Sequence, residues 1–214
     1  MAGYGMSFTN TSDVVTLDSE FSRLVVLSSG RYTRYGAIFP SPITSQEPPL
    51  IFARPDSNGV FQWVRILGDP GNWTGWSNTN SQDVSGSYFL AAYASKPTET
   101  YGMRLWDGGT KLLFDSGTPC AQFTTVITSW TFNGAVNTSV GRWSFHWSAS
   151  APLNSGDYML INNIAMDIPG RDTFSKLSCS WNYSTNTVSI LLQNIGDFNG
   201  NNLFLPVLFA KQIS

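Results

Sequence analysis

The chain has 214 residues, a formal net charge of −2 and only 12% charged residues, about half the share that is usual in soluble domains. No basic run is present, which argues against a nucleic-acid surface, and no apolar stretch reaches the roughly 18 residues of a membrane span. Aromatic residues make up 14% of the chain. A chain with many aromatic and few charged residues is expected to bury part of its surface in an assembly. The alternative is a β-sheet surface that is soluble through neutral polar side chains.

The start of the chain lacks the features of a signal peptide. Met1-Ala2-Gly3-Tyr4 is followed by neither a basic stretch nor an apolar run. We therefore expect the protein to be made and folded in the cytosol.

The first predicted element is a β-hairpin. Residues 5–8 and 14–17 alternate apolar with polar side chains on either side of the turn-forming segment Asn10-Thr11-Ser12-Asp13. Alternation with a period of two gives a strand one buried and one solvated face. We expect two short antiparallel strands joined by a tight turn.

This hairpin segment recurs 97 residues later. Tyr4-Gly5-Met6 returns as Tyr101-Gly102-Met103, and Asp18-Ser19 returns as Asp115-Ser116, with no gap between the two matches. The second copy carries Asp107-Gly108-Gly109, whose residues tolerate positive φ and predict a two-residue hairpin turn. Recurrence at a constant offset indicates an internal duplication.

Short strands continue the first half. They are predicted at 23–27, 51–53, 59–67 and 88–93, where β-branched and aromatic residues cluster. Prolines scattered between residues 37 and 56 exclude helix there and allow only edge strands and extended loops.

The most distinctive polar segment is 69–80, which we interpret as a Gly/Asn-rich loop with Trp73 and Trp76 three residues apart. Exposed Trp rings stack on the apolar faces of sugars, and Asp or Asn side chains bind the hydroxyls. The same loop would suit a protein interface, where Trp is a favoured anchor. A third interpretation packs both rings beneath the loop. The candidate interface or glycan-binding residues are Asp69, Asn72, Trp73, Trp76 and Asn78.

The second half repeats the order of the first. Strands are predicted at 123–127, 142–148, 157–161 and 187–193. Its end also matches the end of the first half. Residues 203–211 correspond to 88–96, now at an offset of 115, so the second half has gained about 18 residues. Residues 160–162 resemble 50–52 more loosely.

These patterns predict an all-β protein, because no period of 3.6 persists long enough for an amphipathic helix. The duplication predicts two tandem antiparallel β-sandwiches of jelly-roll or immunoglobulin-like type. The first would span residues 1–96 and the second 97–214. The alternative is one large sandwich whose first and last strands resemble each other.

Residues suited to catalysis are sparse. His146 is the only histidine and has no partner at metal-ligand spacing. The acidic pairs Asp18/Glu20 and Asp167/Asp172 suit turns better than glycoside hydrolysis, since of the first pair only Asp18 recurs in the second copy. We therefore expect that the protein is not an enzyme and that it has no catalytic residue, no metal site and no cofactor.

The only two cysteines, Cys120 and Cys179, both lie in the second half. Cytosolic thiols normally stay reduced. We expect two buried thiols rather than a disulfide.

The opening of each copy resembles a pattern found in small virion proteins of tailed bacteriophages. The pattern is Tyr-Gly, alternating apolar residues, an Asn/Asp-Gly-type turn, a second short strand and Asp-Ser. Residues 101–116 fit it throughout, whereas residues 4–19 depart at the turn, where Thr11-Ser12 replaces the glycines. The resemblance covers these 16 residues of each copy. It implies a structural protein of the tail tip, baseplate or fibre, without catalytic residues.

We therefore expect a tail component located in the virion and synthesised and assembled in the cytoplasm of the host bacterium. The expected partners are other tail proteins, further copies of the chain in a trimer or a multiple of three, and a host-surface glycan or protein receptor. Nucleic-acid binding and membrane insertion are not expected. The alternative is a carbohydrate-binding module that uses the Trp73/Trp76 loop.

Overall fold

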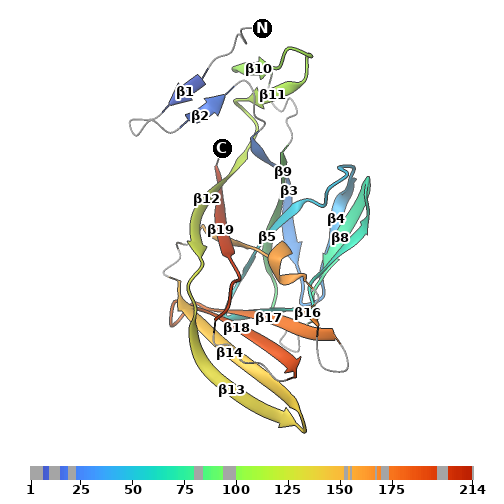
Figure 1. The fold of residues 1–214 in the computed structure, drawn as a ribbon. Coiled ribbons are helices and arrows are strands. Elements are labelled where there is room, and N and C mark those ends of the chain that lie inside the picture. The colour runs from blue at the N-terminus through green and yellow to red at the C-terminus, as the bar shows by residue number, and fades with distance from the viewer. Residues whose placement is uncertain are drawn as a thin grey trace. The chain divides into compact units, whose positions relative to one another are not determined.

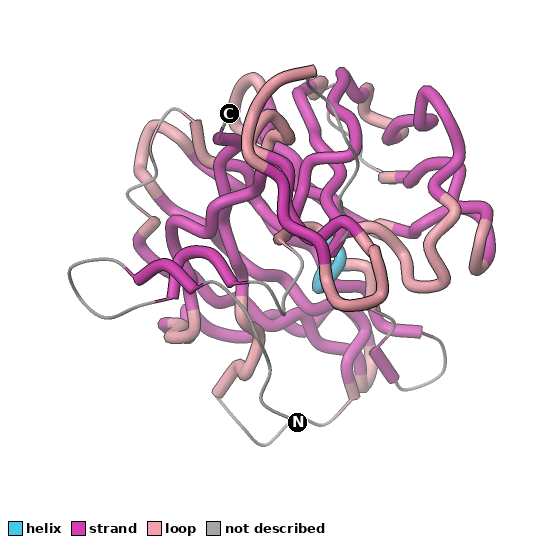
Figure 2. Tube along the Cα trace, turned by 90° about the horizontal axis from the view of Figure 1, so that it is seen from above, coloured by secondary structure: helices cyan, strands magenta, loops and turns pink. Residues whose placement is uncertain are grey.

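The computed structural model describes residues 7–9, 15–18, 23–79, 84–93, 100–151, 154, 156–166, 168–169, 174–196 and 202–213. Regular structure in these residues is antiparallel β-sheet, apart from one short 3-10 helix, η1 (Asn162–Ile164) (Figure 2). The predicted all-β class is confirmed. No helix in this part of the chain is long and apolar enough to cross a membrane.

Short strands alternate with turns along the described residues (Figure 1). Those before residue 97 are β1 (Ser7–Thr9), β2 (Val15–Asp18), β3 (Leu24–Tyr32), β4 (Gly36–Ile43), β5 (Leu50–Pro55), β6 (Gly59–Gln62), β7 (Arg65–Asp69), β8 (Asn72–Ser77) and β9 (Gly86–Tyr93). Those after it are β10 (Arg104–Trp106), β11 (Leu112–Asp115), β12 (Cys120–Ile127), β13 (Thr131–Ser139), β14 (Arg142–Ser150), β15 (Tyr158–Leu160), β16 (Ile168–Pro169), β17 (Phe174–Asn182), β18 (Thr187–Ile195) and β19 (Val207–Ile213).

The repeated sequence segments form two hairpins with the same register. In the β1–β2 hairpin Ser7 lies opposite Asp18, and in the β10–β11 hairpin Arg104 lies opposite Asp115, each residue 97 positions later. Both hairpins shift register between the second and third residues of their first strand. The internal repeat is thus a repeat of backbone pairing as well as of sequence.

The turn of the β10–β11 hairpin is longer than predicted. The Oδ1 atom of Asp107 accepts hydrogen bonds from the backbone N–H groups of Gly109 and Lys111, both at 2.8 Å. Thr110, rather than a glycine, adopts the left-handed conformation, with φ of 69°. The two-residue turn was therefore a wrong prediction, because the Asp side chain organises a wider loop.

Six strands close into a barrel in the order β12-β19-β15-β5-β9-β3. The three pairs of segments that the repeat relates are β3 with β12, β5 with β15, and β9 with β19. If the two strands of each pair are exchanged, every strand of the barrel keeps the same types of neighbour. This is the arrangement expected when two copies of one unit are related by a two-fold axis. Each half of the chain thus supplies three strands to one barrel.

Two further sheets complete the fold. β13-β14-β18-β17-β16 form one, with β6 also paired to β17, and β4-β8-β7 form the other. β4 contains Pro40 and Pro42 and lies at an edge of its sheet. For β4 this agrees with the expectation that prolines restrict the segment to edge strands and loops, because proline has no N–H for a second neighbour. The expectation is wrong for β5, which ends at Pro55 and lies between β15 and β9 in the barrel.

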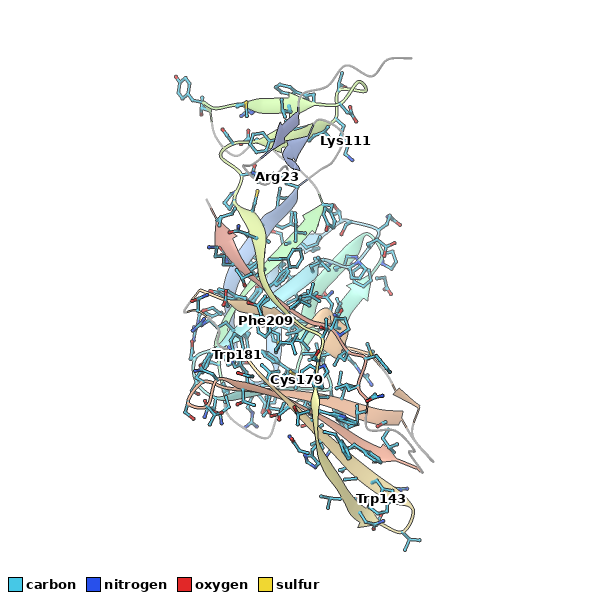
Figure 3. All side chains as sticks on the ribbon, turned by 60° about the vertical axis from the view of Figure 1, so that its left-hand side comes forward. Arg23, Lys111, Trp143, Cys179, Trp181 and Phe209 are labelled. Atoms are coloured by element: carbon cyan, nitrogen blue, oxygen red, sulfur yellow. The ribbon has the colours of Figure 1, made fainter. Side chains whose placement is uncertain are left out.

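The core is rich in aromatic side chains. Phe52 and Phe89 stack with ring centroids 4.7 Å apart, and Trp181 meets Phe209 edge-on at 5.3 Å (Figure 3). All four side chains are buried. Burying a large apolar side chain contributes about 1.5–3 kcal/mol, so these rings are major stabilising contacts.

Two local predictions fail in the first half. The single strand expected over 59–67 is interrupted at Trp63, which is exposed and adopts a φ of 55°, so that β6 and β7 are separate strands. The expected loop over 69–80 contains a strand, β8, instead.

The chain divides into two compact units, each built from non-contiguous segments. One comprises residues 1–27, 91–122 and 212–214, and the other 28–90 and 123–211. Both units draw residues from both sides of position 97. This division does not separate residues 1–96 from residues 97–214. The two tandem sandwiches over these ranges stay a prediction.

Candidate interaction surfaces

The predicted Trp loop is a tight hairpin. Pro70 and Gly71 form its turn, Asp69 lies opposite Asn72, and Gly71 adopts a φ of 85°. Proline followed by a residue of positive φ is the signature of a type II turn. The sequence from Asn72 onward is thereby directed into β8, which pairs with β7 on one side and β4 on the other.

Trp76 belongs to the core. Its side chain is 1% exposed, and its ring lies 5.1 Å from that of Tyr32 and 6.3 Å from that of Phe61. Its indole Nε1 is buried and has no hydrogen-bond partner among the described residues. This ring cannot present a face to a sugar, so the exposed two-tryptophan platform suggested by the sequence is not formed.

Trp73 is half-buried and fixed by a backbone contact. Its Nε1 donates a hydrogen bond to the carbonyl oxygen of Ser45 at 3.0 Å, and the N–H of Gly71 donates to the same oxygen at 2.9 Å. The ring therefore holds the turn against a neighbouring loop. Of the three interpretations left open by the sequence, packing beneath a loop describes Trp73 best.

Asn78 is also structural. It is buried, its Oδ1 accepts a hydrogen bond from the backbone N–H of Gln62 at 2.8 Å, and its Nδ2 donates to the carbonyl oxygen of Val60 at 3.5 Å. Only Asp69 and Asn72 of the five candidate residues are exposed. The five candidate residues are neighbours in the sequence, but in the folded chain they do not form one accessible surface.

A shallow cavity of about 420 Å³ lies beside this hairpin. Its walls include Arg31, Tyr35, Ile38 and Leu67. Tyr35 and Ile38 are exposed, and the guanidinium of Arg34 lies 4.7 Å from the centroid of the Tyr35 ring. The wall is mainly apolar, and its polar side chains are those of Arg31, Thr33 and Tyr35.

The described residues contain no cluster of three or more His, Cys, Asp or Glu side chains that could hold a metal ion. His146 is half-buried within β14. Glu20, Asp167 and Asp172 lie outside the described residues, and the side chain of Asp18 is not described.

Both cysteines are buried free thiols, as predicted. Burial raises the pKa of the Cys179 thiol, which lies 3.7 Å from the sulfur of Met159. A thiol kept protonated in an apolar environment is a poor nucleophile. Cys179 is therefore a packing residue (Figure 3).

The β10–β11 hairpin is held at its base by polar contacts. Ser116 Oγ accepts a hydrogen bond from the N–H of Met103 at 3.0 Å, and the N–H of Ser116 donates to the Met103 carbonyl at 2.9 Å. The guanidinium of Arg23 lies 4.9 Å from the centroid of the buried Phe114 ring (Figure 3). Asp115-Ser116 thus closes this hairpin, as expected of a turn-capping pair.

Beside these contacts, the same hairpin exposes large apolar side chains. Tyr101 is 90% and Trp106 is 53% exposed, and Met103 is also exposed. We call these three residues the hairpin apolar set. β10 and β11 form a sheet of only two strands. Such sheets are marginally stable alone in water, so they usually pack against something else.

Sequence reasoning did not single out the hairpin apolar set. Its signal was present in the conserved spacing of the internal repeat, where Tyr and Met recur at the same positions. Recurrence by itself indicates a duplication, whereas exposure of these side chains is a property of the folded chain. Large exposed aromatics are the residues most enriched at protein interfaces.

Comparisons with known proteins add no assignment: no family model, no curated protein and no solved structure matches this chain.

Proposed function

We propose that this chain is a non-enzymatic structural component of a bacteriophage tail, at the tail tip, the baseplate or a fibre, and that it assembles through protein–protein contacts. The observation that carries the proposal is the hairpin apolar set, exposed on the segment that has the phage-like pattern. Low charge and high aromatic content support it, because such a chain gains stability by burying surface in an assembly.

The two halves are in this view copies of one ancestral β-sandwich. The equal registers of the two hairpins and the exchangeable positions of the barrel strands support a duplication. One half would supply the surface that docks onto the tail and the other would extend outward.

The proposed location is the virion, after synthesis and assembly in the cytoplasm of the host bacterium. Partners would be other tail proteins and further copies of the chain, in a trimer or a multiple of three that matches tail symmetry. A host-surface glycan or protein receptor would be contacted from the outward half. A carbohydrate-binding module built on Trp73 and Trp76 is less well supported, because Trp76 is buried.

The test is incorporation of the chain into virions. Purified particles would be analysed by mass spectrometry for the wild-type chain and for the double variant Tyr101→Ser/Trp106→Ser. We expect the wild type in the particles, and we expect the double variant to fold but to be depleted from them.

The matched control is Phe204→Ser, which removes an equally exposed aromatic side chain outside the hairpin. It should leave incorporation unchanged. Circular dichroism of each purified variant separates loss of docking from loss of folding. Absence of the wild-type chain from purified particles would overturn the proposal. Normal incorporation of the double variant would show that the hairpin apolar set is not the docking contact.

A further inference from the structure

Strand β13 is a long edge strand. It pairs with β14 and with no other strand among the described residues, and it stands at the end of its sheet. Its nine residues span about 30 Å at the usual rise of a strand. One side of its backbone therefore offers a row of N–H and C=O groups that no described strand engages.

This edge lacks two usual protections against pairing. Residues 131–141 contain no charged side chain and no proline, although charges and prolines are the common means by which proteins discourage contacts between edges. Most of β13 is exposed, including Val136 at 57%. Nothing lies within 4 Å of the position that a Cβ atom of Gly134 would occupy.

The sequence of β13 is suited to pairing with itself. About Ala135, two of the four mirrored pairs match in kind, Asn133 with Asn137 and Thr131 with Ser139, whereas Phe132 and Thr138 differ, as do Gly134 and Val136. In an antiparallel pair of identical strands centred on Ala135, these mirrored residues lie opposite one another. Hydroxyl pairs of Thr and Ser are favourable across antiparallel strands, whereas like charges, which β13 lacks, are unfavourable.

The centre of the strand also suits a close approach. Gly134 would lie opposite Val136, so that the residue without a side chain faces the branched one. Register shifts interrupt the pairing with β14 between Phe132 and Gly134 and between Asn137 and Ser139, which leaves Gly134 to Asn137 as the regular stretch. The self-pairing is expected to centre on that stretch.

We propose that β13 pairs antiparallel with β13 of a second copy of this chain, about a two-fold axis near Ala135. The second copy is the occupant because its β13 places Asn133 opposite Asn137 and Gly134 opposite Val136, and it brings no charge to the contact. The contact is isologous, so it closes as a dimer and does not propagate into a filament. The proposal does not depend on a tail function, and a dimer contact is compatible with an assembly of six copies.

Cysteine cross-linking tests the geometry. Ala135→Cys places a thiol beside the proposed axis, where residues directly opposite have Cβ atoms about 4.5–5.5 Å apart. Mild oxidation, or a short bifunctional thiol reagent, should yield a covalent dimer. The native cysteines are buried. The control Ser184→Cys, in the exposed turn after β17, should stay monomeric under denaturing electrophoresis.

A charge substitution tests the energetics. Light scattering of wild-type protein should give a dimer or a multiple of it, and Val136→Lys should shift the population towards the next smaller species, because two ammonium groups then lie near the axis. The control Val126→Lys alters a valine on β12 of nearly equal exposure, 56%, and should leave the oligomer intact. Circular dichroism verifies that both variants are folded.

Each other outcome counts against the proposal. A wild-type monomer at high concentration would mean that the bulges in β13 are enough to keep the edge unpaired. An oligomer that survives Val136→Lys and gives no Ala135→Cys cross-link would place the interface elsewhere. A cross-link only to a different protein would make β13 a site for a heterologous strand.

Discussion

Arg104 and Asp115 form an ion pair across the β10–β11 hairpin, with Nε of Arg104 donating a hydrogen bond to Oδ2 of Asp115 at 2.5 Å. The Asp115 side chain is 4% exposed. Its Oδ1 accepts a second hydrogen bond from the N–H of Gly117 at 3.0 Å. Asp18 occupies the same position in the first hairpin, where the residue opposite it is Ser7, which carries no charge for an equivalent ion pair.

Arg104→Ala should destabilise the hairpin and the residues packed on it. The buried carboxylate of Asp115 would lose its charged donor, and leaving such a group underpaired costs about 1–3 kcal/mol, or more when the group is charged. The measurement is the free energy of unfolding by urea. Lys111→Ala, on the exposed part of the same hairpin, is the control and should change it by no more than about 0.5 kcal/mol.

The two tryptophans of β8 should respond differently to truncation. Trp76→Ala removes a ring from the core and is expected to cost about 3–5 kcal/mol. Trp73→Phe removes mainly the hydrogen bond to Ser45 and should cost about 1 kcal/mol. Thermal unfolding measures both. Equal and small losses would show that Trp76 is not packed as described.

Asn78→Ala should lower stability, because the N–H of Gln62 would lose its acceptor in a buried position. We expect a loss of about 1–3 kcal/mol. Asn72→Ala replaces the exposed candidate residue at the turn and should lie within about 0.5 kcal/mol of wild type. Urea unfolding of both variants tests the contrast, and a neutral Asn78→Ala would contradict a structural role.

Tyr183 should contribute to a loss of stability in alkaline solution. Burial raises its pKa from 10.0 to about 12, and its hydroxyl donates a hydrogen bond to the carbonyl oxygen of Pro55 at 2.6 Å. Because the folded-state pKa lies above that of the unfolded chain, the folded protein holds this proton more tightly. The resulting stabilisation is complete below pH 10 and is lost as the pH rises towards 12.

Tyr183→Phe should therefore flatten the fall in unfolding free energy between pH 10 and pH 12. Part of the slope should remain, because burial also raises the pKa of Tyr32 and of the Cys179 thiol. The comparison at pH 7 isolates the lost hydrogen bond from the titration. An unchanged alkaline slope would mean that Tyr183 is accessible to water in the folded protein.

Local patterns predicted much of the fold correctly. Alternation identified the hairpins and most of the strands, and the prolines restricted β4 to an edge. These features depend on backbone geometry within a few residues. The interruption at Trp63 and the strand β8 were missed, because strand boundaries depend on pairing with partners that are distant in sequence.

The candidate site could be predicted only as a set of residues. Asp69, Trp73 and Trp76 were recognised by type, but their roles depended on burial. Trp76 is buried by Tyr32 and Phe61, which lie outside the segment that drew attention to it. The hairpin apolar set and the edge of β13 were missed for the same reason, since exposure is a property of the whole fold.

The sequence by itself determined the all-β class, the 97-residue repeat of the hairpin and the reduced state expected of the two cysteines, because composition, alternation and recurrence are local properties. Only the tertiary structure decided that both halves supply strands to one barrel, that Trp76 is core while Tyr101 and Trp106 are exposed, and that β13 ends its sheet. The physical reason is that strand pairing and burial arise between residues far apart in the chain, where neither spacing nor residue type specifies the partner.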